Sequence, residues 1–170
     1  MSPLMIARRS LLTLAMALAL APAAHALDLP RQDPAHCKGQ PEIRPLQPLT
    51  IESSGKTYRF MVEFADNDRT RSYGLMCRKA LAPDRGMLFD FKQPTEAAFW
   101  MRNTLIALDI IYIRADGHIL SIARNARPLD ENPIPAGGVI RGVLELRGGR
   151  AAQLGLLPGD RVRHRIFPGG

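Results

Sequence analysis

Two short stretches of the chain carry side chains that could converge on a ligand. These side chains are polar or aromatic and lie close to apolar runs: Arg71, Arg78, Trp100, Arg102, Asn103, Thr104 and Asp109. Guanidinium groups bind carboxylates and phosphates through paired hydrogen bonds, while amide and hydroxyl groups add single donors and acceptors. If folding brings the two stretches together, they would form a pocket for an anionic or sugar-like ligand.

The acidic member of this set has a second interpretation. Asp109 interrupts the apolar run from Leu108 to Ile113, and a buried carboxylate needs a partner. Arg71 or Arg78 could supply that partner in a purely structural ion pair. Asn103 and Thr104 could equally close a turn.

Sulfur-containing side chains suggest a different chemistry. Met76, Met87 and Met101 lie in three separate motifs, and Trp100 precedes Met101. Thioethers select Cu(I), and a tryptophan ring can shield the ion. The alternative is that these methionines only fill the core. A Cu(I) cofactor is therefore the alternative to no cofactor.

Hydrolysis would need a nucleophile with a base, or two carboxylates that face each other. Glu96, Asp109 and Glu145 could supply such a pair for cleavage of an envelope polymer. Ser72 and Ser121 lack the Gly-x-Ser-x-Gly context of a hydrolase nucleophile. Binding is favoured over catalysis.

The N-terminus has the order of a secretory signal. Arg8 and Arg9 precede an apolar run from Leu11 to Leu20, and Ala24-His25-Ala26 offers a small-x-small cleavage site. The run is too short to span a bilayer. We expect residues 1–26 to be a cleavable signal peptide, with an exported, periplasmic product and no transmembrane anchor.

The remaining chain reads as a proline-rich extended leader, residues 27–48, and one globular domain, residues 49–168. Removing the two signal arginines lowers the formal charge from +7 to +5. The remaining arginines alternate with apolar residues, as on solvated strand faces, and do not indicate a nucleic-acid partner. Cys37 and Cys77 are the two cysteines. In an exported protein an even count favours a disulfide, although two free thiols are the alternative.

Period-two alternation of apolar and polar residues predicts a mainly β fold with one or two short helices. We expect about eight short strands, at 49–52, 57–64, 87–91, 97–102, 108–114, 118–123, 139–146 and 161–167. Asp66 could cap a first helix that ends at Gly74, and a second helix would cover 150–154. Such a pattern closes as a β-sandwich or a distorted barrel.

Four segments carry a resemblance to a known family: "RTRSYGLMCRKAL", "GMLFDF", "FWMRNTLIALDIIYI" and "GVLELRGG". Together they resemble the domain-of-unknown-function 192 family from about Leu49 to Phe167. The sequence departs from that family at Cys77, where an aromatic or aliphatic residue is usual, and at Arg102, where lysine is frequent. The resemblance implies a compact β-sandwich that is often exported or membrane-anchored, and it supplies no established reaction.

Taken together, the sequence predicts an exported, non-catalytic domain that binds a ligand or an envelope partner. Its recognition surface would lie around Trp100 and the segment from Arg71 to Arg78. A Cu(I)-binding protein and an envelope-polymer hydrolase are the alternatives.

Overall fold

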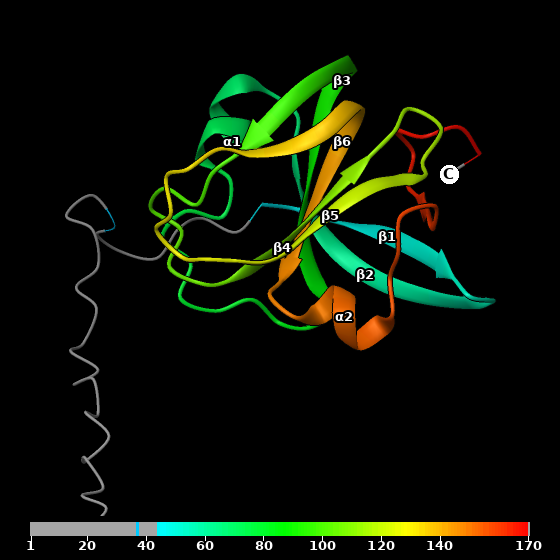
Figure 1. The fold of residues 1–170 in the computed structure, drawn as a ribbon, viewed down its shortest axis with the longest axis horizontal. Coiled ribbons are helices and arrows are strands. Elements are labelled where there is room, and N and C mark those ends of the chain that lie inside the picture. Colours follow the sequence, from blue (N-terminus) through cyan, green and yellow to red (C-terminus); the bar gives the residue numbers. More distant parts are fainter. Residues whose placement is uncertain (1–36, 38–43, 170) are drawn as a thin grey trace, which may run out of the picture. The chain divides into compact units, whose positions relative to one another are not determined.

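Seven strands form one sheet whose edges curl toward each other (Figure 1). The computed structural model of the protein describes residues 37 and 44–169, so the expected signal peptide and most of the expected leader lie outside the described residues. The strands are β1 (Leu46–Ser53), β2 (Lys56–Ala65), β3 (Arg85–Phe99), β4 (Leu108–Ile113), β5 (Ile119–Ala126), β6 (Ile134–Arg147) and β7 (Arg161–Arg163). The helices are α1 (Asp68–Tyr73) and α2 (Arg150–Leu154).

The sheet has the order β5-β4-β6-β3-β2-β1-β7, and backbone contacts join its two outermost strands. Ile119 N–H donates to the Asp160 carbonyl at 2.8 Å, and Gly159 N–H donates to the Ile119 carbonyl at 2.9 Å. A bridge between His118 and Arg161 continues this contact. The architecture is therefore mainly β with two short helices, as predicted, and it corresponds to the distorted barrel.

The two faces of the central strands support two separate cores. Leu88, Ile111 and Leu144 point to one side, where β1, β2, β7 and α2 also contribute apolar side chains. Met87 and Val143 point to the other side, which is covered by α1 and long connecting segments. β4 is buried along its whole length because it contributes to both cores. The second core carries the candidate site.

One parallel pairing places α1 over the second core. β2 and β3 run parallel, so the chain must cross the sheet between them, and α1 lies in that crossover. The helix begins one residue later than predicted: Asn67, and not Asp66, accepts from Thr70 N–H, while Thr70 Oγ1 accepts from Asn67 N–H. Gly74 ends the helix as expected, at φ 52°, and a Cβ there would lie 3.3 Å from the ring of Phe89.

The strand count falls from eight to seven because the Gln93–Pro94 segment does not break the chain into two strands. β3 runs on through it with a register shift between Asp90 and Thr95, and Lys92 adopts φ 66°. Proline lacks the N–H that a sheet ladder needs, and this unpaired irregularity tolerates it. β6 also begins inside the segment expected to be a loop, and β7 stops at Arg163. No helix in the described residues is long and apolar enough to cross a bilayer.

Candidate functional site

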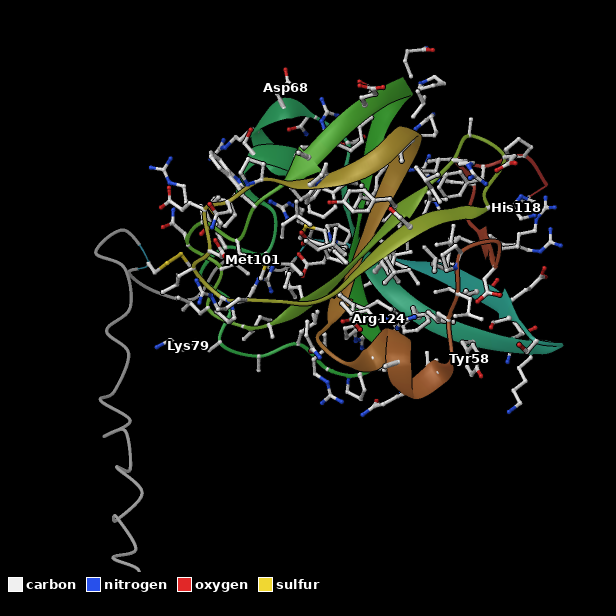
Figure 2. All side chains as sticks on the ribbon, viewed as in Figure 1. Tyr58, Asp68, Lys79, Met101, His118 and Arg124 are labelled. Atoms are coloured by element: carbon white, nitrogen blue, oxygen red, sulfur yellow. A yellow bond between two sulfur atoms is a disulfide. The ribbon has the colours of Figure 1, made fainter. Side chains whose placement is uncertain are left out.

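A pocket of about 430 Å³ opens between α1, the outer half of β3 and the segment that follows β3. The polar part of its lining comes from Asp68, Arg71, Ser72, Thr104 and Glu145. The larger side chains of its apolar part are Tyr73, Leu75, Met76, Phe89, Phe91, Phe99 and Trp100. Figure 2 shows Asp68 on α1. Apolar walls with a few polar groups are typical of small-molecule sites.

Glu145 is the buried polar group of the pocket. It lies on β6 opposite Met87 of β3 and is only 5% exposed. Its Oε2 is buried and has no hydrogen-bond partner among residues 37 and 44–169. Burial raises the pKa of Glu145 to about 8, because removal from water disfavours the carboxylate. At neutral pH most molecules therefore carry a protonated Glu145, which can both donate and accept a hydrogen bond.

Aromatic rings hold each other in place around this acid. Phe99 makes edge-to-face contacts with Phe89, Phe91 and Tyr112 at centroid distances of 5.1, 6.3 and 6.0 Å. Tyr112 Oη donates to the carbonyl of Ile134. Burial, and to a lesser degree the charge of Glu145, raises the pKa of Tyr112. This cluster forms a rigid apolar wall.

Two large side chains at the pocket remain open to solvent. Trp100 is 48% exposed and Tyr73 is 41% exposed. The guanidinium of Arg102 lies 5.6 Å from the Trp100 ring centroid, a contact that favours this ring position. An entering ligand could therefore contact two aromatic rings before it reaches Glu145.

The positive charge at the pocket is already engaged. Arg71 forms an ion pair with Asp68, donates to the Asp90 carbonyl at 2.8 Å and lies 5.7 Å from the Phe91 ring centroid. These contacts fix Arg71 along the wall. An anionic ligand would have to compete with them.

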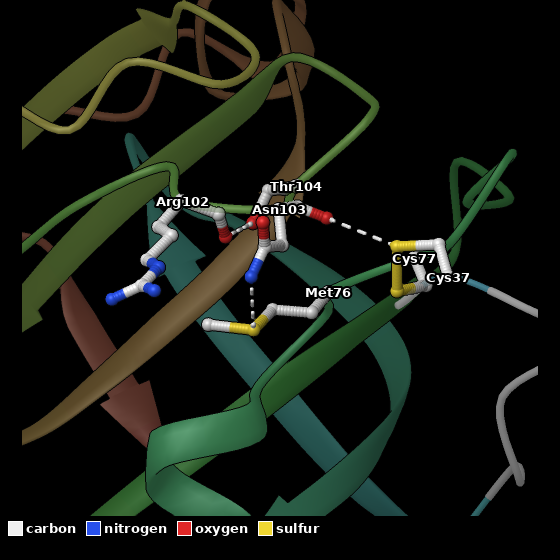
Figure 3. Close-up of a disulfide and its surroundings, with 6 residues drawn as sticks. All are labelled: Cys37, Met76, Cys77, Arg102, Asn103 and Thr104. Atoms are coloured by element: carbon white, nitrogen blue, oxygen red, sulfur yellow. Dashed lines mark hydrogen bonds between the residues drawn. A yellow bond between two sulfur atoms is a disulfide. The ribbon is translucent and has the colours of Figure 1, made fainter. Parts of the chain in front are cut away.

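The disulfide between Cys37 and Cys77 lies beside the pocket wall (Figure 3). Cys77 N–H donates to the Asn103 carbonyl at 2.9 Å, and Asn103 Nδ2 donates to Met76 Sδ at 3.8 Å. Cys37 Sγ lies 4.0 Å from the same carbonyl, and as a disulfide sulfur it has no proton to donate. The expected Cys37–Cys77 pairing is thus present, and it supports the segment that carries Met76.

Comparison with known proteins identifies the family. The model of the DUF192 family, described as "Uncharacterized ACR, COG1430", matches residues 49–164. The chain belongs to the DUF192 family. None of the curated proteins compared with it matches.

Two solved structures resemble this DUF192 domain closely. One, from Sinorhizobium meliloti 1021, is described as a proposed transcription regulator; it is 36% identical with a TM-score of 0.72, covering 75% of this chain and 100% of its own. The other, from Novosphingobium aromaticivorans DSM 12444, is a protein of unknown function; it is 39% identical with a TM-score of 0.70, covering 79% of this chain and 99% of its own.

Three of the seven predicted ligand-binding residues of the DUF192 domain line the pocket: Arg71, Trp100 and Thr104. Arg78 instead pairs with the buried Glu63 at 2.8 Å. Arg102 borders the pocket through its contact with Trp100, and Asn103 supports Met76 from outside the lining.

The predicted ion pair of Asp109 with Arg71 or Arg78 is wrong. Asp109 is fully buried, and its carboxylate accepts from the backbone N–H groups of Asn125 at 2.8 Å, Gly149 at 3.1 Å and Ala151 at 2.7 Å. Gly149 is the N-cap of α2, and Ala151 lies in its first turn. The carboxylate therefore satisfies donors that a helix N-terminus leaves unpaired, and no guanidinium is needed.

The three methionines of the Cu(I) hypothesis have different surroundings. Met76 lines the pocket, whereas Met87 and Met101 are fully buried in the second core. Met87 Sδ accepts a hydrogen bond from Arg44 at 3.6 Å. Residues 37 and 44–169 contain no group of three His, Cys, Asp or Glu side chains that could hold a metal ion. Cu(I) binding by the methionines stays a prediction.

The carboxylate pair expected of a hydrolase does not form among the three candidates. Glu96 is exposed and lines a different pocket. Asp109 is paired in register with Leu146, and Glu145 with Ile110. Since neighbouring residues on a strand point to opposite faces, Asp109 and Glu145 lie on opposite sides of the sheet.

Sequence reasoning did not connect Glu145, Tyr73, Phe91 and Phe99 with the ligand site. The sequence does mark Glu145, because this acid interrupts an apolar run just as Asp109 does. The aromatic residues gave no such signal, since alternating Phe residues are typical of any packed strand.

Proposed function

We propose that this DUF192 domain is a binding protein of the cell envelope that holds a small organic ligand in the pocket at Glu145. The observation that carries the proposal is a carboxyl group, 95% buried, with an unpartnered oxygen in a pocket bordered by exposed aromatic rings. An unsatisfied buried polar atom costs about 1–3 kcal/mol. A ligand that donates to Oε2 would remove this cost on binding.

A binding role fits the distribution of acids better than hydrolysis does. Glu145 is the only one of the three candidate carboxylates that lines this pocket. Asp68, the other carboxyl group in the lining, is exposed and paired with Arg71. A single protonated acid such as Glu145 can orient a ligand, whereas the usual glycosidase mechanism needs two carboxyl groups across the scissile bond.

Export is supported by the signal-like N-terminus and by the disulfide, since disulfides persist in oxidising compartments. We expect the mature protein to be recovered from the periplasm with Leu27 as its first residue. Mass spectrometry of periplasmic extracts tests this expectation. Recovery of the intact chain from the cytosol would contradict it.

The proposal includes no nucleic-acid partner, although one structural neighbour is described as a proposed transcription regulator. Several arginines are neutralised within the fold. Arg78 pairs with Glu63, Arg141 with Asp90, and Arg163 with Glu52. Such pairing reduces the positive potential available for phosphates.

Amide shift mapping tests the binding site. We would titrate the ¹⁵N-labelled protein with phenethylamine, phenethyl alcohol, 3-phenylpropionate and methyl glucoside, which differ in charge and apolar surface. At least one compound is expected to shift amides of residues 68–76, 98–104 and 145 and to change the fluorescence of Trp100, the only tryptophan in the chain. If all four leave these amides unchanged, or shift only amides elsewhere, the proposed site is wrong.

A further inference from the structure

The two ionisable groups Arg71 and Glu145 differ in how many partners they have at the pocket. Arg71 has partners in Asp68 and the Asp90 carbonyl. Glu145, in contrast, has a buried Oε2 with no hydrogen-bond partner in the part of the chain that the structure describes. The ionised form of Glu145 can only accept hydrogen bonds. A hydrogen-bond donor that carries positive charge would therefore stabilise the carboxylate most strongly.

The walls around Glu145 also suit a cation. The pocket lining includes five aromatic residues: Tyr73, Phe89, Phe91, Phe99 and Trp100. Aromatic ring faces attract ammonium and guanidinium groups. Cations already use two of these rings, since Arg71 lies over Phe91 and Arg102 over Trp100. The same rings can pack against an apolar ligand body.

We propose that the ligand is an organic amine, with its ammonium group on Glu145 and its apolar body against the aromatic wall. This inference rests on the proposed function of the pocket and specifies its ligand class. It replaces the anionic or sugar-like ligand expected from the sequence, because the arginine that lines the pocket is already paired while the acid is not.

Proton linkage distinguishes an amine from a neutral ligand. Burial raises the pKa of Glu145 to about 8, so an ammonium ligand must displace a proton from most molecules at pH 7. The other titratable groups of the pocket lining are Asp68, Arg71 and Tyr73 from α1. Tyr112 of β4 interacts electrostatically with Glu145. On the far side of Met87, the buried Glu63 is paired with Arg44 and Arg78. Below pH 8, amine affinity should rise about tenfold for each pH unit until Glu145 is ionised. An alcohol hydrogen-bonds to the protonated acid and should show no such rise.

The decisive experiment is calorimetry of phenethylamine and phenethyl alcohol at pH 6, 7 and 8. Phenethylamine stays protonated over this range. We expect its affinity to increase about tenfold from pH 6 to 7 and about fivefold from pH 7 to 8, with close to one proton released at pH 7. This pH series uses the unsubstituted protein, so it does not depend on a variant that folds.

Two variants assign the effect to its residue. Glu145→Gln should lower amine affinity to that of the alcohol and abolish the pH dependence. Glu96→Gln, which removes an acid at an exposed position outside this pocket, should change neither. Alcohol binding as tight as amine binding, or amine affinity that does not rise with pH, would overturn the amine inference while leaving the pocket a binding site. Failure of all probes to reach the pocket amides would overturn the proposed function as well.

Discussion

Replacement of Glu145 by Gln should change how the stability of the domain depends on pH. An unfolded chain ionises this residue near its ordinary pKa of 4.5, whereas burial raises the pKa to about 8 in the folded protein. Between these values the unfolded state releases a proton that the folded state keeps. The raised pKa therefore contributes stability that is fully present below pH 4.5 and is lost as the pH rises through 8.

The size of this effect follows from the two pKa values. Each pH unit between them lowers the free energy of unfolding by about 1.4 kcal/mol, and the total change from pH 5 to pH 8 is about 3.5 kcal/mol. Glutamine does not ionise, so Glu145→Gln removes this loss. From pH 5 to pH 8, the free energy of unfolding of the variant should rise by about 3.5 kcal/mol relative to that of the parent. The effect of the new amide itself on stability does not depend on pH, so it does not alter this change.

Urea unfolding of both proteins at pH 5, 6, 7 and 8 measures this difference directly. Other titrating groups cancel, because the two proteins share them. Glu96→Gln controls for the loss of one acid at an exposed position. A constant stability difference between parent and Glu145→Gln across the four pH values would show that Glu145 ionises alike in the folded and unfolded states, contrary to the raised pKa.

Three further predictions test other parts of the fold. Asp109→Ala leaves three backbone N–H groups without their acceptor; we expect a loss of about 3 kcal/mol in urea unfolding, and an unchanged midpoint would contradict the capping role. Replacing Cys37 and Cys77 together by Ser should lower the free energy of unfolding by about 4 kcal/mol, because the bridge spans 40 positions; equal stability of oxidised and substituted proteins would argue against it. Burial lowers the pKa of His164 to about 4. As the pH drops from 6.5 through 4, the unfolded chain therefore takes up a proton before the folded protein does, and the free energy of unfolding falls. His164→Gln should reduce this fall when unfolding is followed by circular dichroism; an equal fall in both proteins would show that His164 is not its cause.

The strands with clear alternation could be predicted because each packs one face against a core. Tyr58, Phe60, Val62 and Phe64 recur at every second position, and they lie within β2. An Asp-Gly pair favours a tight hairpin turn, and Asp116-Gly117 lies between β4 and β5, where Gly117 adopts φ 87°. Pairing partners could not be predicted. The parallel contact of β2 with β3 depends on tertiary packing, and it is this contact that places α1 over the second core.

The candidate site could be predicted only at positions where a polar or aromatic residue lies within or beside an apolar run. Trp100 and Thr104 stood out as polar or aromatic residues beside apolar runs, and both line the pocket. Asp109 also interrupts an apolar run, yet its partners are backbone N–H groups of β5 and of the N-terminus of α2, which lie 16 to 42 positions further along the chain. No local pattern distinguishes such an acid from Glu145, because the difference lies in what each side of the sheet packs against.

A ¹³C NMR titration of the Glu145 side-chain carboxyl measures the pKa of this group in the free and the amine-bound protein. Without ligand, the carboxyl should titrate with a midpoint near pH 8. Saturating phenethylamine should move the midpoint at least two pH units lower, because the ammonium binds the ionised form. A midpoint near 4.5 in the free protein, or one that does not respond to the amine, would contradict Glu145 as the unpartnered anchor of a binding pocket.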